Sequence, residues 1–506
     1  MPGETYVHRC WKYSYLIIGL IFLSPLIQAE VTLPNVLADH MVIQRNKPVH
    51  MWGNADPGEK VVVSFRGQQG SATADDLGRW SVYLSPGDAG GPFTLTVQGK
   101  NAITLNDVLV GDLWIASGQS NMEFPMSKTD WGLGTKNSEE EIAAANYPQL
   151  RLFHVEEATS DYPMTDVAAK TWTACTPQSV GGFSAVAYFF GRDLLQKVKV
   201  PIGLIETDWG GTPAESWTSL QALSSNSLMP VFAARAHMMR DESATLLEQK
   251  YEKQQQAADI AAGRPARKSA WHPDPNSWAP SALFNAMIAP FTPLPIRGAI
   301  WYQGESNADP DRAPLYSTLF PAMIEDWRSQ WAQGDFPFLF VQIANYITDA
   351  DSPTVRDAQR KTLALANTGM AVTIDIGDPN NIHPVDKQDV GYRLALWARV
   401  LSYGEHIEDS GPLFRQGVPD GNKMRVWFDH SNSGIVVRGD QLHGFEVAGT
   451  DGKFAPATAK IDGDSILAWS DAVPSPVYVR YGWAANPQCN LYNRDGLPAS
   501  PFTSQH

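Results

Sequence analysis

From residue 108 to residue 402 the sequence alternates between short apolar runs and stretches with helical periodicity. Each apolar run ends in polar turn residues, and continuous apolar runs of this length are typical of parallel strands buried on both faces. The alternation predicts an α/β domain in which helices cover both faces of a mainly parallel sheet, with the loops after the strands gathered at one edge. The apolar runs cover residues 113–116, 202–207, 299–302, 338–343 and 370–376, and the helical stripes lie within 186–198, 316–331 and 390–397.

All-β patterns flank this α/β domain. Residues 30–107 contain short runs rich in β-branched and aromatic residues, separated by Gly, Pro, Asn and Asp, which predicts a small N-terminal β-sandwich. Residues 403–506 return to the same pattern and predict a C-terminal β domain. Residues 220–280 depart from the α/β plan, because a charged, Gln-rich helical piece runs into a Pro-bearing segment. We interpret them as a helical and loop insertion within the domain at 108–402.

Residues 1–29 have the features of a signal peptide. His8, Arg9 and Lys12 precede an apolar run at 16–23, and Ala29 is a suitable last residue before cleavage. Ile27 is larger than the side chain usual at its position, so an uncleaved anchor is the alternative. We therefore expect an exported protein, periplasmic or extracellular, with no membrane contact after cleavage.

The net charge and the cysteines limit the kinds of binding partner, disulfide and metal site that we expect. A formal net charge of −15 argues against nucleic acid and anionic membrane surfaces, since both are polyanions that recruit Lys and Arg. Outside the signal peptide, Cys175 and Cys489 could form a disulfide or remain free buried thiols. Neither has a spacing typical of a metal site, so no metal is expected. The sequence does not indicate an oligomeric state.

The segment Trp114–Met122 ends an apolar run at a glycine and presents Ser120. A strand that stops in a Gly-containing turn exposes a short polar side chain at the carboxyl edge of a sheet, so Ser120 is a candidate nucleophile. The alternative is an ordinary strand-to-loop turn. A nucleophile needs a base and oxyanion donors from elsewhere in the chain.

Three later loops contain candidates for these roles. His383 follows a predicted strand and precedes a predicted helix, which places it at the same sheet edge as Ser120, as a general base. The backbone amides of Gly210 or Gly211 and the side-chain amide of Gln303 are candidate oxyanion donors, although each is also common in plain turns.

Four motifs then occur in one order along the chain: GQSNM at 118–122, WGGTP at 209–213, WYQGESN at 301–307 and IHP at 382–384. In this order they resemble the sialate O-acetylesterase family, carbohydrate esterases of the SGNH-hydrolase type, and the similarity spans nearly the whole mature chain. The resemblance implies a flavodoxin-like three-layer α/β domain flanked by β domains, with no cofactor. It implies Ser120 as nucleophile, His383 as base, and an oxyanion hole made by Ser120 N–H, the Gly210–Gly211 turn and Gln303.

The third member of the expected triad departs from this pattern. SGNH hydrolases typically place an aspartate three residues before the histidine, where this chain has Asn380. An amide can orient an imidazole but does not offset the charge of imidazolium. The candidates for this role are Asp378, Glu305 and a backbone carbonyl of the turn at 380–381. We favour a Ser–His dyad held by that carbonyl, with Asp378 second.

The chemistry expected of these groups is hydrolysis of a sugar acetyl ester through an acetyl-enzyme. O-acetylated sialic acid is the favoured substrate, acetylated xylan is the alternative, and a non-catalytic carbohydrate-binding protein with a degenerate site is a third possibility. The side chains expected to contact the sugar are Gln119, Asn121, Glu305 and Trp209, with Trp217 and Trp131 as further candidates for stacking.

Overall fold

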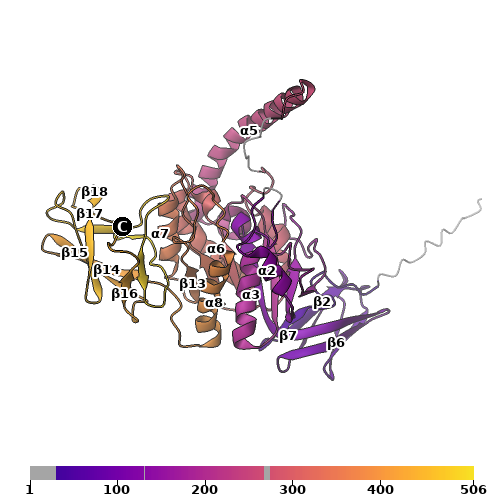
Figure 1. Ribbon diagram of the computed structural model, residues 1–506. Coiled ribbons are helices and arrows are strands. Elements are labelled where there is room, and N and C mark those ends of the chain that lie inside the picture. Colours follow the sequence, from indigo (N-terminus) through magenta and orange to yellow (C-terminus); the bar gives the residue numbers. More distant parts are fainter. Residues whose placement is uncertain (1–29, 130–131, 267–273, 506) are drawn as a thin grey trace, which may run out of the picture.

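A computed structural model of the chain describes residues 30–129, 132–266 and 274–505 (Figure 1). The predicted signal peptide and Trp131 lie outside the described residues. In the described part, no helix combines the length and the hydrophobicity that a membrane span requires. The sequence left open whether Cys175 and Cys489 form a disulfide or remain free thiols. In the structure both are free thiols.

A mixed sheet forms the centre of the molecule, in the order β13-β12-β11-β7-β10-β8-β9. All neighbours in this order pair in parallel except β8 and β9, which are antiparallel. Every residue of β10, β11, β12 and β13 is buried, so both faces of this part of the sheet are covered, as the continuous apolar runs predict. The bounds are β7 (Ala102–Gly118), β8 (Tyr147–His154), β9 (Thr173–Cys175), β10 (Ile202–Asp208), β11 (Gly298–Tyr302), β12 (Phe338–Val341) and β13 (Thr368–Ala371).

Helices pack on this sheet in two pairs. α3 lies against α8, and both contact the sheet, while α6 lies against α7. Gly391 permits the close approach of α3 and α8, because a Cβ atom there would lie 2.6 Å from the Cβ atom of Phe189. The bounds are α1 (Ser120–Glu123), α2 (Ser138–Ala144), α3 (Ala185–Val198), α6 (Tyr316–Trp331), α7 (Ser352–Thr362) and α8 (Lys387–Tyr403). The three helices predicted from periodicity correspond to α3, α6 and α8.

The N-terminal strands join this sheet through β7. The first part of β7 pairs antiparallel with β6 and parallel with β1, and its second part runs between β10 and β11. The domain boundary expected after residue 107 therefore falls inside one strand, at Asp107, where φ is 53°. The bounds are β1 (Val42–Gln44), β2 (Val49–Asn54), β3 (Lys60–Phe65), β4 (Gln68–Thr73), β5 (Arg79–Leu84) and β6 (Gly90–Gln98).

The C-terminal region has its own apolar core between antiparallel sheets, at the yellow end of Figure 1. One sheet has the order β14-β15-β20-β19, another β18-β17-β21-β23, and β16 pairs with β22. The bounds are β14 (Leu413–Asp420), β15 (Lys423–Asp429), β16 (Ile435–Val437), β17 (Phe445–Ala448), β18 (Phe454–Pro456), β19 (Thr458–Asp462), β20 (Ser465–Trp469), β21 (Tyr478–Tyr481), β22 (Leu491–Asn493) and β23 (Phe502–Thr503).

The insertion expected at 220–280 contains the longest helix, α5 (Met229–Ala261), which projects away from the rest of the molecule (Figure 1). The segment begins with α4 (Leu220–Leu223). Short helical turns connect the remaining elements: η1 (Ala214–Trp217), η2 (Asn226–Leu228), η3 (Phe284–Ile288), η4 (Ala289–Phe291), η5 (Glu305–Asn307) and η6 (Ala313–Leu315).

Candidate active site

The loops that follow β7, β10, β11 and β13 meet at the carboxyl edge of the central sheet. Gly118, the last residue of β7, is paired with Asp208 of β10 on one side and with Tyr302 of β11 on the other. Gly118 has φ 143°, and a Cβ atom there would lie 2.1 Å from the Tyr302 carbonyl oxygen. Only glycine allows the strand to end this close to its neighbour, directly before Ser120.

Ser120 and His383 meet at this edge, although 263 positions separate them in the sequence. Ser120 is the first residue of α1, and its Oγ lies 2.9 Å from His383 Nε2. Both residues are half-buried, so the pair is screened from bulk water but remains accessible. The distance is within hydrogen-bond reach, which is the geometry that proton transfer from a hydroxyl to an imidazole requires.

His383 is held in its neutral form. Burial, assisted by the positive charge of Lys387, lowers the pKa of His383 from 6.5 to about 4. Its backbone N–H donates to Asn381 Oδ1 at 2.9 Å, so the side chain of the turn at 380–381 fixes the main chain beside the imidazole. Asp378 is exposed, and its carboxylate accepts a hydrogen bond from the Asn380 backbone N–H at 2.8 Å, within its own turn.

A buried polar network lies behind the serine and the histidine. Asn121 is fully buried, and its Nδ2 donates to Glu305 Oε1 at 2.7 Å and to the Ile382 carbonyl at 3.0 Å. Its Oδ1 accepts a hydrogen bond from Lys387 Nζ at 2.5 Å. Asn121 and Glu305 were expected to contact sugar. In the structure Asn121 is buried, Glu305 is half-buried, and their side chains are bonded to each other inside the protein. Lys387 was not predicted at all.

Both charged members of this network have shifted pKa values. Burial raises the pKa of the Glu305 carboxyl, while burial lowers the pKa of Lys387 to about 7, against the opposing effect of the Glu305 charge. Lys387 Nζ also lies 4.7 Å from the centre of the Phe124 ring and 5.4 Å from that of Tyr302, distances typical of cation–π contacts.

The Gly210–Gly211 turn lies directly beside the serine. A Cβ atom at Gly210 would lie 3.3 Å from Ser120 Cβ and 2.7 Å from Glu123 Oε2, so a side chain there would displace the Glu123 carboxylate and press against Ser120. The Gly210 N–H donates to the Glu123 carboxylate. Within the described part of the chain, the backbone N–H groups of Ser120 and Gly211 form no turn or loop hydrogen bond with a backbone carbonyl, so they are candidate donors to an oxyanion.

Several carboxyl groups gather beside this turn, and the sequence did not suggest their proximity. Burial, followed by repulsion between neighbouring carboxylates, raises the pKa of Asp208 well above its ordinary value and that of Glu157 to about 7. The pKa of Glu123 and Glu206 is raised mainly by burial as well, and Glu206 pairs with His154 at 3.0 Å. Near neutral pH the group carries less negative charge than free carboxylates would.

Gln303 occupies a different position from the one expected of an oxyanion donor. Its side chain is fully buried, and Nε2 donates to the Thr212 carbonyl at 3.2 Å and to Asn307 Oδ1 at 2.7 Å. Its Oε1 accepts from the Tyr316 hydroxyl at 3.0 Å. Both amide hydrogens are therefore used inside the protein, where they brace the turn that carries Gly210 and Gly211.

The chain is similar in sequence to proteins that share one family name. A family model described as carbohydrate esterase, sialic acid-specific acetylesterase, matches residues 260–396. The sialate O-acetylesterase of Mus musculus is 32% identical, covering 92% of this chain and 93% of its own length. The human protein of the same name is 31% identical, covering 91% and 90%. The chain belongs to the sialate O-acetylesterase family.

A solved structure supports the same assignment of this family member. A carbohydrate acetylesterase from Xanthomonas citri is 40% identical, with a TM-score of 0.81, covering 94% of this chain and 99% of that chain. Because this match covers 94% of the chain, it includes most of the N-terminal, central and C-terminal regions.

The remaining side chains expected to contact sugar divide into two groups. Trp209 is half-buried and follows β10 at the carboxyl edge of the central sheet, the edge where Ser120 and His383 lie and which we call the active edge. Trp217 is fully buried, with its ring 6.0 Å from that of Trp301, so the expectation that it stacks on sugar is wrong. Gln119 is also buried, and its Oε1 accepts from the backbone N–H of Ser306 at 3.2 Å, which holds the turn after β11.

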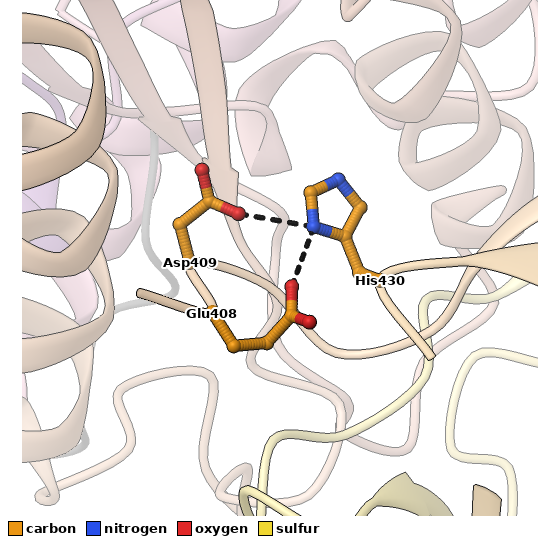
Figure 2. A group of neighbouring side chains, drawn as sticks. All are labelled: Glu408, Asp409 and His430. Atoms are coloured by element: carbon orange, nitrogen blue, oxygen red, sulfur yellow. Dashed lines mark hydrogen bonds and ion pairs between the residues drawn. The ribbon is translucent and has the colours of Figure 1, made fainter. Parts of the chain in front are cut away.

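A second cluster of titratable groups in this family member lies at the junction with the C-terminal sheets (Figure 2). His430 Nδ1 is 2.8 Å from Glu408 Oε1 and 3.0 Å from Asp409 Oδ1. Burial opposes the charged imidazole, but the hydrogen bonds and charges of Asp409 and Glu408 prevail and raise the pKa of His430. Among the described residues these are the ones spaced to share a metal ion, but their mutual ion pairs already account for the arrangement.

Proposed function

We propose that the protein is a serine esterase that removes acetyl groups from sugar hydroxyls, with O-acetylated sialic acid as the first substrate to test. The observation that carries the proposal is the 2.9 Å approach of Ser120 Oγ to His383 Nε2 at the carboxyl edge of a parallel sheet. The family supports the choice of ester and sugar, because the mouse and human relatives carry the name sialate O-acetylesterase.

The reaction follows from the groups at this edge. His383 Nε2 takes the proton of the Ser120 hydroxyl as Oγ attacks the acetyl carbonyl carbon, and the carbonyl oxygen becomes negative. The N–H groups of Ser120 and Gly211 bind that oxygen. The ester C–O bond breaks, the sugar oxygen takes the proton from His383, and an acetyl-enzyme remains. Water then attacks the acetyl group with His383 as base, and acetate leaves.

The orientation of the imidazole is the remaining part of the proposed mechanism. The exposed position of Asp378 and its bond to Asn380 favour a dyad over a triad completed by that carboxylate. Glu305 is bonded to Asn121, which places it in the buried network instead. The main chain of His383 is fixed by Asn381 and, through Ile382, by Asn121.

We propose a flavodoxin-like, three-layer SGNH domain as the scaffold, with β-sandwich domains at both ends. Numbered along the chain with β8 and β9 left out, the strands β10, β7, β11, β12 and β13 follow the order 2-1-3-4-5, which is the flavodoxin-like order. β8 and β9 are additions beyond β10. Export through the signal peptide at 1–29 is likewise a proposal, and secretion of the full chain from a suitable host would test it.

Acetylated plant polysaccharide is the second candidate substrate. The observation in its favour is the 40% identity with a carbohydrate acetylesterase whose name specifies no sialic acid. The loops around the active edge select the sugar, whereas the Ser–His pair supplies only the ester chemistry.

The test measures acetate release from O-acetylated sialic acid, acetylated xylo-oligosaccharide and a chromogenic acetate. We expect Ser120→Ala to abolish release from every ester that wild type hydrolyses. Ser117→Ala is the matched control, because its buried hydroxyl has no hydrogen-bond partner in the described part of the chain, and it should retain activity. Turnover that survives in Ser120→Ala would overturn the mechanism, and hydrolysis of the xylo-oligosaccharide alone would replace the first substrate with the second.

A further inference from the structure

The Asn121 amide joins the nucleophile turn to the loop that carries the base. Asn121 directly follows Ser120, and its Nδ2 donates to the carbonyl of Ile382, the residue directly before His383. The same nitrogen donates to Glu305 Oε1. A shift of this amide would therefore move the main chain on both sides of the 2.9 Å contact between Ser120 and His383.

The orientation of that amide is dictated by Lys387. An ammonium group donates hydrogen bonds and accepts none, so it must face the oxygen of the amide, and Nδ2 must point the other way. If the amide turned over, Nδ2 would face the ammonium and Oδ1 would face the Glu305 carboxylate and the Ile382 carbonyl, with repulsion at each contact. Lys387 thus selects the one orientation that ties the two loops together.

The network contains a balancing charge for the lysine. Lys387 is fully buried, and Glu305, although half-buried as a residue, has its Oε2 shielded from water. The two side chains bond to opposite ends of the same amide, so each charge is compensated through Asn121. Glu305 Oε2 has no hydrogen-bond partner among the described residues, which makes the nearby positive charge more important to it.

We propose that Lys387 is a positioning residue for the Ser120–His383 pair, because it orients the Asn121 amide that fixes both loops. Its positive charge also opposes protonation of the His383 imidazole, in addition to the larger effect of burial. The inference rests on the proposed function, because Ser120 and His383 must be the reacting groups. It also explains how the site works with Asn380 where an aspartate is usual, since the buried charges act from behind the pair.

Other titratable groups face this network from the elements packed around it. Glu305 lies on η5, Tyr302 ends β11, and His383 lies on the loop before α8. Arg356 of α7 contributes positive charge to Glu305 and Tyr302. On the solvent side, Asp386 precedes Lys387 and pairs with Lys136 at 2.9 Å.

The primary experiment compares Lys387→Met with Lys136→Met, using the chromogenic acetate over a range of pH. Lys136 is exposed and pairs with Asp386 at the start of the same helix, so it controls for loss of a nearby positive charge. For Lys387→Met we expect kcat to fall about 100-fold with KM little changed, because the reacting pair is misplaced. We also expect the acidic limb of kcat/KM to move to higher pH, because the charge that opposes protonation of His383 is gone. Lys136→Met should show neither effect.

A second variant allows for the chance that Lys387→Met leaves the Glu305 charge unbalanced and destabilises the fold. In Glu305→Gln/Lys387→Met both charges are removed, and the Gln Oε1 still accepts from Asn121. We expect it to be more stable than Lys387→Met while showing the same shift of the acidic limb.

The outcomes separate this inference from the proposed function. If Ser120→Ala is inactive but both lysine variants keep the wild-type kcat and acidic limb, the positioning role is wrong and the esterase remains. A lower kcat with an unmoved limb in both variants would also overturn it, since a merely structural role gives that result. If Ser120→Ala retains activity, the proposed function itself is wrong.

Discussion

Gly210 lies where two parts of the active edge meet. A Cβ atom at this position would lie 2.7 Å from the Glu123 carboxylate and 3.3 Å from the Cβ atom of Ser120, so both would have to shift. The close contact sets the distance between the proposed nucleophile and the turn that we propose as a source of oxyanion donors. One methyl group at this position would therefore disturb the reacting geometry without removing any catalytic group.

We expect Gly210→Ala to lower kcat about 100-fold, a loss comparable to removal of one oxyanion donor. Gly182→Ala is the matched control, since a Cβ atom there meets nothing within 4 Å. Steady-state kinetics on the chromogenic acetate, with thermal unfolding as a check on folding, would measure both. Equal activity in the two variants would show that the turn does not contribute to catalysis.

The neutral state of His383 predicts an unusual pH dependence. Burial, with the Lys387 charge, lowers the pKa of this base from 6.5 to about 4, so the imidazole should stay unprotonated and active down to about pH 4. We expect kcat/KM to fall only as the pH passes below that value. A profile of kcat/KM against pH checks this, and an acidic limb centred near 6.5 would contradict it.

At the scale of elements, α7 connects the central sheet to the C-terminal sheets (Figure 1). Arg356 on this helix is fully buried and donates to the carbonyls of Ile343 and Ala344, after β12, at 2.9 and 2.8 Å. The same guanidinium donates to Ala484 and Ala485, after β21, at 2.8 Å each. One planar donor group thus satisfies carbonyls from both regions.

We expect Arg356→Lys to lower the free energy of unfolding by about 2–4 kcal/mol, because a lysine cannot reach all these carbonyls and leaves some buried without a donor. Arg360→Lys, on the same helix and paired with Asp357 at 2.7 Å, should cost less than about 1 kcal/mol. Urea unfolding monitored by tryptophan fluorescence compares them. Similar losses in the two variants would mean that the junction does not depend on Arg356.

The elements that sequence patterns predicted share one property, a strong local signal. Apolar runs identified β10 and β11, and periodicity identified α3, because burial of these segments is visible in their own residues. β8 and α7 were not predicted. β8 begins with the mixed residues Tyr147-Pro148-Gln149, and α7 is rich in Arg, Asp and Gln that are buried only by partners far along the chain.

The same distinction applies to the active site. The positions of Ser120, His383 and Gly210 at one edge of the sheet could be predicted, because strand ends and glycine turns are local features. The places of Asn121, Glu305 and Gln303 could not, because amide and carboxyl side chains can bind a ligand or bind each other, and only the three-dimensional packing decides. Lys387 resembles a surface lysine at a helix start, and its burial comes from loops that are distant in sequence.

At the scale of the whole molecule, the group in Figure 2 joins the end of β15 to the chain that leaves α8. His430 follows β15 and pairs with Glu408 and Asp409, while its ring lies 5.5 Å from that of Trp397 on α8. A protonated imidazole strengthens this junction, because its charge is then attracted to both carboxylates.

The raised pKa of His430 gives the junction a pH dependence with a definite sign. The stabilisation should be complete below the pKa of an unfolded histidine, about 6.5, and should disappear as the pH rises through the higher folded value. We expect His430→Gln to lower Tm at pH 5.5 and to have little effect at pH 9. His406→Gln, at an exposed position nearby, serves as control, and a Tm difference independent of pH would contradict the linkage.

The strand β7 starts in the N-terminal sheet and ends two residues before Ser120. Because a single strand belongs to both regions, the N-terminal module is not a detachable appendage: removing it would strip β7 of β6 and β1, its partners along its first half. A shortened protein that begins at the central sheet would leave the first half of β7 without its hydrogen-bonding partners, as an exposed strand. Engineering by exchange of modules is better directed at the C-terminal region, which has a core of its own and whose chain enters only after α8 has ended. Such an exchange must keep carbonyls that accept from Arg356, as those of Ala484 and Ala485 do.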